Sequence, residues 1–417
     1  MMSKEKRRVP KLRFPGFTED WEQRKLEDLV DVLDGDRGKN YPKEVDFDVQ
    51  GHTLFLNASN VTNEGFSFKT NQYITEEKSN SMGNGRLVED DVIITSRGSL
   101  GHIAWYNQMT QCVMPHVRIN SGMLILRKRV DISMSYLQQF LRSYKGQSQI
   151  SFISFGSAQP QLTKKDVQKI NITYPANLKE QIKIETYFSA LDNLITLHQR
   201  KLDNLKLKKK ALLQKLFPRN GERYPELRFP GFTDAWEQRK FSDLYKKISE
   251  KNDLSYSLDK IISVANMYYK SDAKVSNEEY LKTYNIFRYG EIAFEGNKSK
   301  DFTYGRFVEN TIGDGIISHV FEVFRPITKY DIYFWKYYIN YEPIMGKVLS
   351  RCTKKTTMMT NLVAKDFLKE TVFVPSLAEQ KRIGILLNTL DKSITLHQRK
   401  LEHLQIQKKS LLQKLFV

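Results

Sequence analysis

The sequence predicts an α+β protein in which two globular modules are separated by a pair of long antiparallel helices, arranged as a pseudo-two-fold tandem repeat. Two observations predict this architecture. The chain repeats two blocks of sequence in the same order, and the downstream block carries apolar residues spaced alternately four and three apart. We therefore expect globular modules over residues 1–175 and 218–375, and helices over residues 176–217 and 376–417.

The repeated blocks enclose two regions that hardly resemble each other. The downstream block, residues 191–217, corresponds to residues 390–416, whereas residues 45–155 and 260–350 share only weak landmarks. A solenoid would need more and shorter repeats, so two large modules fit better. The upstream block is Pro10-Lys11-Leu12-Arg13-Phe14-Pro15-Gly16-Phe17-Thr18, which recurs as Pro225-Glu226-Leu227-Arg228-Phe229-Pro230-Gly231-Phe232-Thr233.

Each downstream block opens with the signature of a helix start. Asn177-Leu178-Lys179-Glu180 and Ser376-Leu377-Ala378-Glu379 both follow a proline and fit a capping box, in which the first and fourth residues satisfy each other's backbone amides. The first helix should stop near Phe217, because Pro218 cannot continue it comfortably. Some forty residues at 1.5 Å each make a helix about 60 Å long.

Both helices carry the a/d stripe of a coiled coil. His198 and His397 interrupt it at the same point, as do Lys209 and Lys408, and we interpret them as register-setting polar positions or snorkelling side chains. Metal binding by the histidines is disfavoured because no second ligand lies at i+4. The expected packing residues are Ile184, Leu191, Ile195, His198, Leu202, Leu205, Leu212 and Leu216 in the first helix, and Ile383, Leu390, Ile394, His397, Leu401, Leu404, Leu411 and Leu415 in the second.

Connectivity predicts the relative direction of the helices. The first leaves module one and delivers the chain to module two, whereas the second starts at module two. If a pseudo-dyad relates the modules, the second helix runs back, and the antiparallel pair acts as a spacer between the modules.

Composition points to a polyanionic partner. Lys and Arg outnumber Asp and Glu by 66 to 48, giving a formal net charge of +18 at pH 7, although a basic surface kept for solubility would give the same charge. Cys112 and Cys352 are too few for a disulfide framework or a thiolate zinc site. Neither a signal peptide nor a membrane-spanning run is evident, so we expect a cytoplasmic protein without membrane contact.

The variable regions contain polar segments suited to DNA. Thr95-Ser96-Arg97-Gly98-Ser99 follows a strand-like stretch and suits phosphate or guanine contact, although an ordinary glycine turn has the same pattern. Arg351-Cys352-Thr353-Lys354-Lys355-Thr356-Thr357 is cationic and rich in hydroxyls, as a phosphate contact would be. The candidate DNA-binding residues are Asn57, Ser59, Asn60, Ser96, Arg97, Ser99, Ser157, Gln159, Asn266, Asn297, Lys298, Arg351, Lys354, Lys355 and Thr357.

Catalytic signatures are mostly missing. Gly296-Asn297-Lys298-Ser299 lacks the upstream glycine spacing of a phosphate-binding loop, and no His/Cys cluster has metal-ligand spacing. Glu76-Glu77-Lys78 imitates the acidic-x-Lys element of a nuclease without its strand context. We therefore expect neither a catalytic residue nor a metal site, which disfavours a self-contained nuclease or methyltransferase.

The repeated blocks resemble those of the specificity subunit of Type I restriction-modification enzymes. The resemblance rests on Pro175, Glu180-Gln181, Ile184, Leu191-Asp192 and Ile195, with their counterparts at Pro375, Glu379-Gln380, Ile383, Leu390-Asp391 and Ile394. Ser96-Arg97-Gly98-Ser99 and Gln159-Pro160-Gln161-Leu162 are similar to landmarks of the family's DNA-reading domains. The second half departs from them, with Asn297-Lys298 in place of Arg-Gly and Met359-Thr360-Asn361 in place of Gln-Pro-Gln.

The resemblance implies two target recognition domains, each reading one half of a bipartite asymmetric site in double-stranded DNA. It also implies two modification subunits that methylate adenine with S-adenosylmethionine, and restriction subunits that use ATP and Mg, so that this chain itself holds no cofactor. A scaffold that binds only proteins is the alternative, and salt-dependent DNA retention separates the two.

Overall fold

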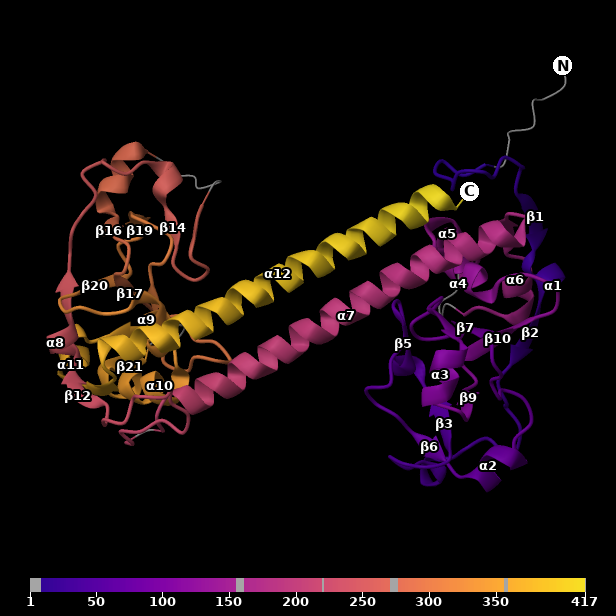
Figure 1. The fold of residues 1–417 in the computed structure, drawn as a ribbon, viewed down its shortest axis with the longest axis horizontal. Helices are drawn as coiled ribbons and strands as arrows, with labels where there is room; N and C mark the ends of the chain where they lie inside the picture. Colours follow the sequence, from indigo (N-terminus) through magenta and orange to yellow (C-terminus); the bar gives the residue numbers. More distant parts are fainter. Residues whose placement is uncertain (1–8, 155–160, 220, 271–276, 356–358, 417) are drawn as a thin grey trace, which may run out of the picture. The chain divides into compact units, whose positions relative to one another are not determined.

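The computed structural model describes residues 9–154, 161–219, 221–270, 277–355 and 359–416. The chain forms two compact units: unit 1 comprises residues 1–198 and 400–417, and unit 2 comprises residues 199–399. Each unit contains a globular lobe, the first half of one long helix and the second half of the other (Figure 1). The lobe of unit 1 is called lobe 1, and the lobe of unit 2 is called lobe 2.

Lobe 1 is built on a four-stranded antiparallel sheet with the strand order β2-β10-β7-β8. Its strand β7 is buried on both faces: Val92 and Ile94 point into one apolar core, and Ile93 points into another. This alternation follows from the two-residue period of a strand. The elements of lobe 1 are β1 (Glu22–Lys25), α1 (Leu26–Leu29), β2 (Val30–Asp34), β3 (Thr53–Leu56), β4 (Val61–Thr62), β5 (Gly65–Phe66), β6 (Tyr73–Ile74), α2 (Glu76–Ser81), β7 (Asp91–Thr95), β8 (Ile103–Tyr106), α3 (Gln108–Val113), β9 (Val117–Ile119), β10 (Met123–Lys128), α4 (Met134–Arg142), α5 (Tyr144–Ser154), α6 (Lys164–Gln168) and β11 (Asn171–Tyr174).

Lobe 2 repeats this sheet although its sequence differs. The strand order β13-β20-β17-β18 corresponds position by position to the sheet of lobe 1, and β12 pairs with β23 as β1 pairs with β11. Ile292 and Phe294 face one core while Ala293 faces another. The elements of lobe 2 are β12 (Glu237–Lys240), α8 (Phe241–Leu244), β13 (Tyr245–Ile248), β14 (Ile262–Ser263), β15 (Tyr268–Tyr269), β16 (Asn285–Phe287), β17 (Ile292–Glu295), β18 (Arg306–Glu309), β19 (Gly315–Ile317), β20 (Glu322–Pro326), α9 (Ile332–Tyr338), α10 (Glu342–Cys352), β21 (Thr353–Lys355), β22 (Thr360–Leu362), α11 (Ala364–Lys369) and β23 (Thr371–Val374).

The two long helices are α7 (Leu178–Leu216) and α12 (Leu377–Leu415), each of 39 residues. The α7 helix ends just before Pro218, as the sequence predicts. All the predicted packing residues of both helices are buried or half-buried. In unit 1, Leu404 and Leu415 from the end of α12 share a core with Ile184 and Leu191 from the start of α7.

The same exchange occurs in unit 2, where Leu216 at the end of α7 shares a core with Ile383 and Leu387 at the start of α12. Because the end of one helix packs against the start of the other in each unit, the helices run antiparallel. The predicted α+β fold with two lobes and an antiparallel helix pair is confirmed.

The prediction of reciprocal capping boxes is wrong for one of the two hydrogen bonds of each box, the one that the glutamate carboxylate was expected to accept. Asn177 Oδ1 accepts a hydrogen bond from the amide of Lys179 at 3.0 Å, which is an ordinary N-cap contact. However, the Glu180 carboxylate does not return to the backbone of Asn177 in the described part of the chain. It accepts from Arg13 Nε and Nη2 at 2.7 and 2.8 Å instead.

The second helix repeats this arrangement with Glu379 and Arg228, at 2.9 and 2.7 Å. A bidentate guanidinium offers two charge-assisted hydrogen bonds, whereas the backbone amide offers one neutral bond, so the arginine takes the carboxylate. These ion pairs join the upstream repeated block to the start of each helix.

The two seam lysines also form ion pairs between the helices. Lys408 pairs with Asp192 in unit 1, and Lys209 Nζ lies 2.6 Å from Asp391 in unit 2. Burial lowers the pKa of Lys408. Each lysine near the end of one helix therefore meets an aspartate near the start of the other, which accounts for the interruptions of the stripe at Lys209 and Lys408.

We expect Asp192→Ala to destabilise unit 1 by about 1 to 3 kcal/mol, because it leaves a buried ammonium without its carboxylate. Lys408→Met should cost less, since the methionine fills the same volume without a charge. A double-mutant cycle in chemical denaturation measures the coupling of the pair. Additive losses would mean that the two side chains do not interact, which would contradict this account.

Candidate nucleic-acid interface

The polar loop that follows β7 lies at the surface of lobe 1. The backbone amide of Ser96 donates to the carbonyl of Gly122 at 2.8 Å, which closes the loop against the turn between β9 and β10. Gly98 has a φ of +73°, a conformation that favours glycine. Arg97 and Ser99 on either side of it are exposed.

The turn formed by residues 57–60 lies beside this loop. A Cβ atom added to Gly98 would lie 3.9 Å from the Cβ of Ala58. The Asn57 side chain accepts from the amide of Ser59 at 2.9 Å, and Ser59 Oγ lies 3.1 Å from Thr70 Oγ1. Ser59 is exposed and Asn57 is half-buried.

The segment after residue 160 joins the same surface. The amide of Leu162 donates to the carbonyl of Ser96 at 3.0 Å, and Arg97 Nε donates to Gln161 Oε1 at 2.9 Å. The fold thus brings together three segments of lobe 1 that the sequence analysis proposed separately.

Two candidates in lobe 1 are not exposed. Asn60 is fully buried, and its side-chain Nδ2 donates to the carbonyls of Ser67 and Thr70 at 3.0 and 2.9 Å. Ser96 is 2% exposed. Both side chains are buried, so neither is available to a ligand in this structure.

Lobe 2 assembles its corresponding segments through different contacts. The amide of Thr360 donates to the carbonyl of Gly296 at 2.9 Å, and Asn297 forms an isolated bridge with Met359. Arg306 donates to Glu295 at 2.7 Å and to the carbonyl of Ala265 at 2.8 Å, which links the 263–266 turn to β17. Asn266, Asn297 and Lys298 are exposed on this surface.

In the cationic segment predicted to contact phosphate, residues 351–357, one positive charge is already paired within lobe 2. Arg351 is exposed, but its Nε lies 2.9 Å from Glu370 Oε2, and the ion pair raises the pKa of Arg351. Its charge is therefore compensated within the lobe. Lys354 is exposed on β21. The candidates Ser157, Gln159 and Thr357 lie outside the described residues, as does the side chain of Lys355.

Two residues of these surfaces were missed as candidates. Gln161 belongs to the quoted Gln159-Pro160-Gln161 segment, but nothing in that segment shows that its amide meets Arg97. Arg306 lies in β18, opposite Glu295 on the neighbouring strand β17 and 41 residues from Ala265, and carries no local signal. The role of each depends on contacts between distant segments.

A buried carboxylate at the start of the central strand supports each surface. In lobe 1, Asp91 accepts from Arg127 Nη2 at 2.7 Å and from the amide of Val88 at 2.8 Å. In lobe 2, Glu291 accepts from Arg325 Nε at 2.5 Å and from the amide of Arg288 at 2.7 Å. Burial raises the pKa of both carboxyls, although the arginines oppose the shift.

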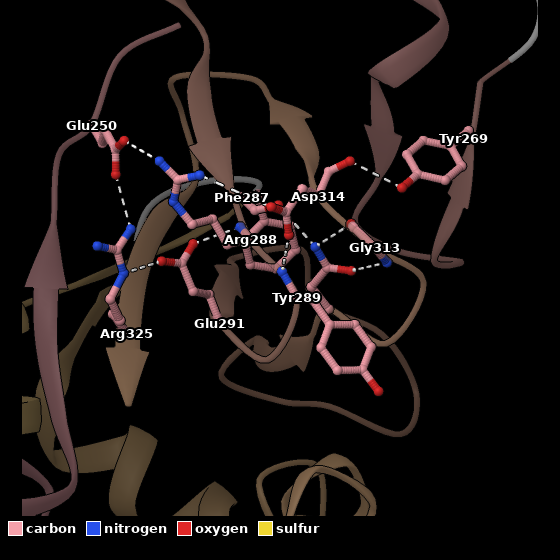
Figure 2. A network of polar contacts seen from close by, with 10 residues as sticks. Glu250, Tyr269, Phe287, Arg288, Tyr289, Glu291, Gly313, Asp314 and Arg325 are labelled. Atoms are coloured by element: carbon pink, nitrogen blue, oxygen red, sulfur yellow. Dashed lines mark hydrogen bonds and ion pairs between the residues drawn. The ribbon is translucent and has the colours of Figure 1, made fainter. Parts of the chain in front are cut away.

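Lobe 2 extends this contact into a larger network (Figure 2). Glu250 lies between Arg288 and Arg325, and Figure 2 shows both guanidinium groups turned toward its carboxylate. The hydrogen bond from Arg325 is the main cause that holds the pKa of Glu250 below its ordinary range. Asp314 accepts from the amide of Tyr289 at 2.8 Å. The network joins β20 to the segment after β13 and to the residues just before β17, and so supports β17, the strand that carries the Asn297 loop.

Among the described residues, no cluster of three His, Cys, Asp or Glu side chains has the geometry of a metal site. The described helices also contain no stretch long and apolar enough to cross a bilayer.

Two lobes on one sheet plan, each with its own polar loops and joined to a helix pair, define a tandem lobe-and-helix protein. A family model described as "Type I restriction modification DNA specificity domain" matches residues 18–207 and again residues 233–405. The chain therefore belongs to the family of Type I restriction-modification DNA specificity domains.

The chain is also similar to a curated relative and, in its fold, to a solved structure. The sequence assigned as the type I restriction enzyme MjaX specificity subunit of Methanocaldococcus jannaschii is 24% identical over 205 residues, which are 48% of this chain and 46% of that protein. The match thus spans about half the length of the relative. The crystal structure of the Type I restriction-modification system S subunit from M. genitalium aligns with 98% of this chain and 99% of its own, at a TM-score of 0.64 and 14% identity. That likeness concerns the fold.

Proposed function

We propose that this chain is the DNA-reading subunit of a Type I restriction-modification complex and that each lobe reads one half of a bipartite, asymmetric DNA site. One observation carries the proposal. The lobes share a sheet plan but present different polar groups at the same place, Ser96-Arg97-Gly98-Ser99 in one and Gly296-Asn297-Lys298-Ser299 in the other. Equivalent scaffolds with different loops suit two readers of different half-sites.

The partners in this proposal supply the chemistry. Two modification subunits methylate adenine with S-adenosylmethionine, and restriction subunits use ATP and Mg, while this chain contributes no catalytic residue. The membership of the family and the net charge of +18 support a role on DNA. The repeated helix pair offers one equivalent surface for each of two identical modification subunits.

A lobe swap tests the proposal. Residues 45–155 are replaced by the corresponding segment of another family member, and the methylated adenines are mapped in cells that carry the complete system. We expect one half of the recognised site to change and the other half to remain, because only lobe 1 is altered.

A strain without the gene provides the control and should lose the methylation pattern. The proposal is wrong if the swap changes both halves together, or if methylation survives loss of the gene unchanged.

A further inference from the structure

Arg97 is exposed, yet one edge of its guanidinium is already fixed. Its Nε donates to Gln161 Oε1 at 2.9 Å, and its backbone amide donates to the carbonyl of Gly122 at 3.3 Å. The two terminal amino groups of Arg97 form no hydrogen bond or ion pair with any residue that the structure describes.

Gln161 is itself fixed. Its neighbour Leu162 is 1% exposed, and the amide of Leu162 donates to the carbonyl of Ser96 at 3.0 Å. Both partners of the side-chain contact are thus tied to the same loop. The Arg97 side chain therefore loses little conformational entropy when it binds a ligand.

The neutral acceptor leaves the charge of Arg97 uncompensated. Arg306 in lobe 2 is held by the Glu295 carboxylate, and Arg351 is held by Glu370. Gln161 instead orients its arginine without cancelling the charge. With Nε occupied, the edge that remains is the one formed by the two terminal amino groups, and this edge matches the O6 and N7 acceptors of guanine.

From this geometry we propose that Arg97 reads a guanine in the major groove at one position of the lobe 1 half-site, and that Gln161 is the positioning residue that presents it. The inference rests on the proposed function. Lobe 2 has Asn297 at the corresponding place after β17, so this mode of guanine reading belongs to lobe 1 alone.

The test uses the complete modification complex and a library of DNA duplexes randomised across both half-sites, with methylation as the readout. The wild type should require guanine at one position of the lobe 1 half-site. Arg97→Ala should lose that preference and methylate the original site about tenfold to 100-fold less. The lobe 2 half-site should not change.

Gln161→Met should weaken the preference at the same position by a smaller factor, because the arginine remains but is no longer oriented. Adding Gln161→Met to Arg97→Ala should have no further effect if the glutamine acts through the arginine. Arg97→Lys, which keeps the charge but lacks the planar fork, should also lose the preference for guanine.

Arg24→Ala is the matched control, because Arg24 is an exposed arginine of lobe 1 that pairs with Glu22 on β1. It should leave the site unchanged. A phosphate contact by Arg97 would weaken all sequences equally and reduce the salt dependence, and that result overturns the inference. An unchanged guanine preference in Arg97→Ala overturns it too. If the wild-type complex shows no bipartite preference at all, the proposed function fails first and this inference fails with it.

Discussion

Phe416→Ala is expected to destabilise unit 1 by about 3 to 5 kcal/mol, the usual cost of deleting a buried phenyl group. Phe416 lies at the end of α12 and is 6% exposed. Its ring centroid lies 5.5 Å from that of Tyr136 and 5.9 Å from those of Phe140 and Phe188. Figure 1 shows the end of α12 beside α4 and α5 of lobe 1. Phe416 therefore completes the core of lobe 1, and chemical denaturation should register the loss of its ring.

Phe217→Ala is the matched variant for unit 2, because Phe217 contacts Tyr338 at 5.2 Å and Tyr341 at 5.0 Å between ring centroids. Leu396→Ala is the control on the helix surface, where the side chain is 67% exposed, and should change stability by less than about 0.5 kcal/mol. A loss below about 1 kcal/mol for Phe416→Ala would show that the aromatic cluster does not stabilise lobe 1.

The helices could be predicted from the sequence because their signals are local. The apolar spacing repeats within each block, and the whole block recurs in the second half. The role of Phe416 and Phe217 was not predicted, although the shared Leu-Leu-Gln-Lys-Leu-Phe block contains them. Their contacts lie in lobes that are distant in sequence, so periodicity within the helix gives no information about them.

The sheet that the two lobes have in common could not be predicted from the sequence, for a similar reason. Strand order depends on pairings between distant segments. One weak landmark of the variable regions is Asp91-Val92-Ile93-Ile94, which corresponds to Glu291-Ile292-Ala293-Phe294, and it marks only one strand of the sheet. What the landmark preserves is a buried carboxylate with an arginine partner, Arg127 in lobe 1 and Arg325 in lobe 2.

The candidate surface was predicted only in part. Arg97 was found because a polar loop containing glycine follows an apolar strand. Asn60 and Ser96 have the same polar character but are buried: the Asn60 side chain donates to backbone carbonyls, and the backbone of Ser96 pairs with Gly122 and Leu162. Composition cannot distinguish a polar group that faces solvent from one that is satisfied inside a lobe.

Replacement of Glu309 is also expected to change the stability of unit 2 strongly. The carboxyl group of Glu309 is buried in lobe 2 without a hydrogen-bond partner among the described residues. Burial raises its pKa well above the ordinary value of 4.5, the charge of Asp331 adds to the shift, and Lys336 opposes it. The nearby Tyr245 hydroxyl on β13 is also buried and unpaired, and Glu309 contributes to the raised pKa of Tyr245 and of Tyr330. The folded state therefore favours neutral Glu309.

The sign of the pH dependence follows from that preference. A raised pKa in the folded state gives stability that is fully present below the ordinary pKa and is lost as pH rises toward the folded pKa. Between those two pKa values the wild type should lose about 1.4 kcal/mol for each pH unit relative to a variant without the carboxyl group.

We therefore expect Glu309→Met to stabilise unit 2 at neutral pH, and its advantage over the wild type should grow as pH rises from 5. Glu309→Gln keeps the shape of the side chain without an ionisable group and should show the same growing difference from the wild type. Urea denaturation between pH 5 and pH 9 measures both. A difference that stays constant over this range would mean that Glu309 is ionised in the folded lobe, and then the polar surroundings of β18 must stabilise a buried charge.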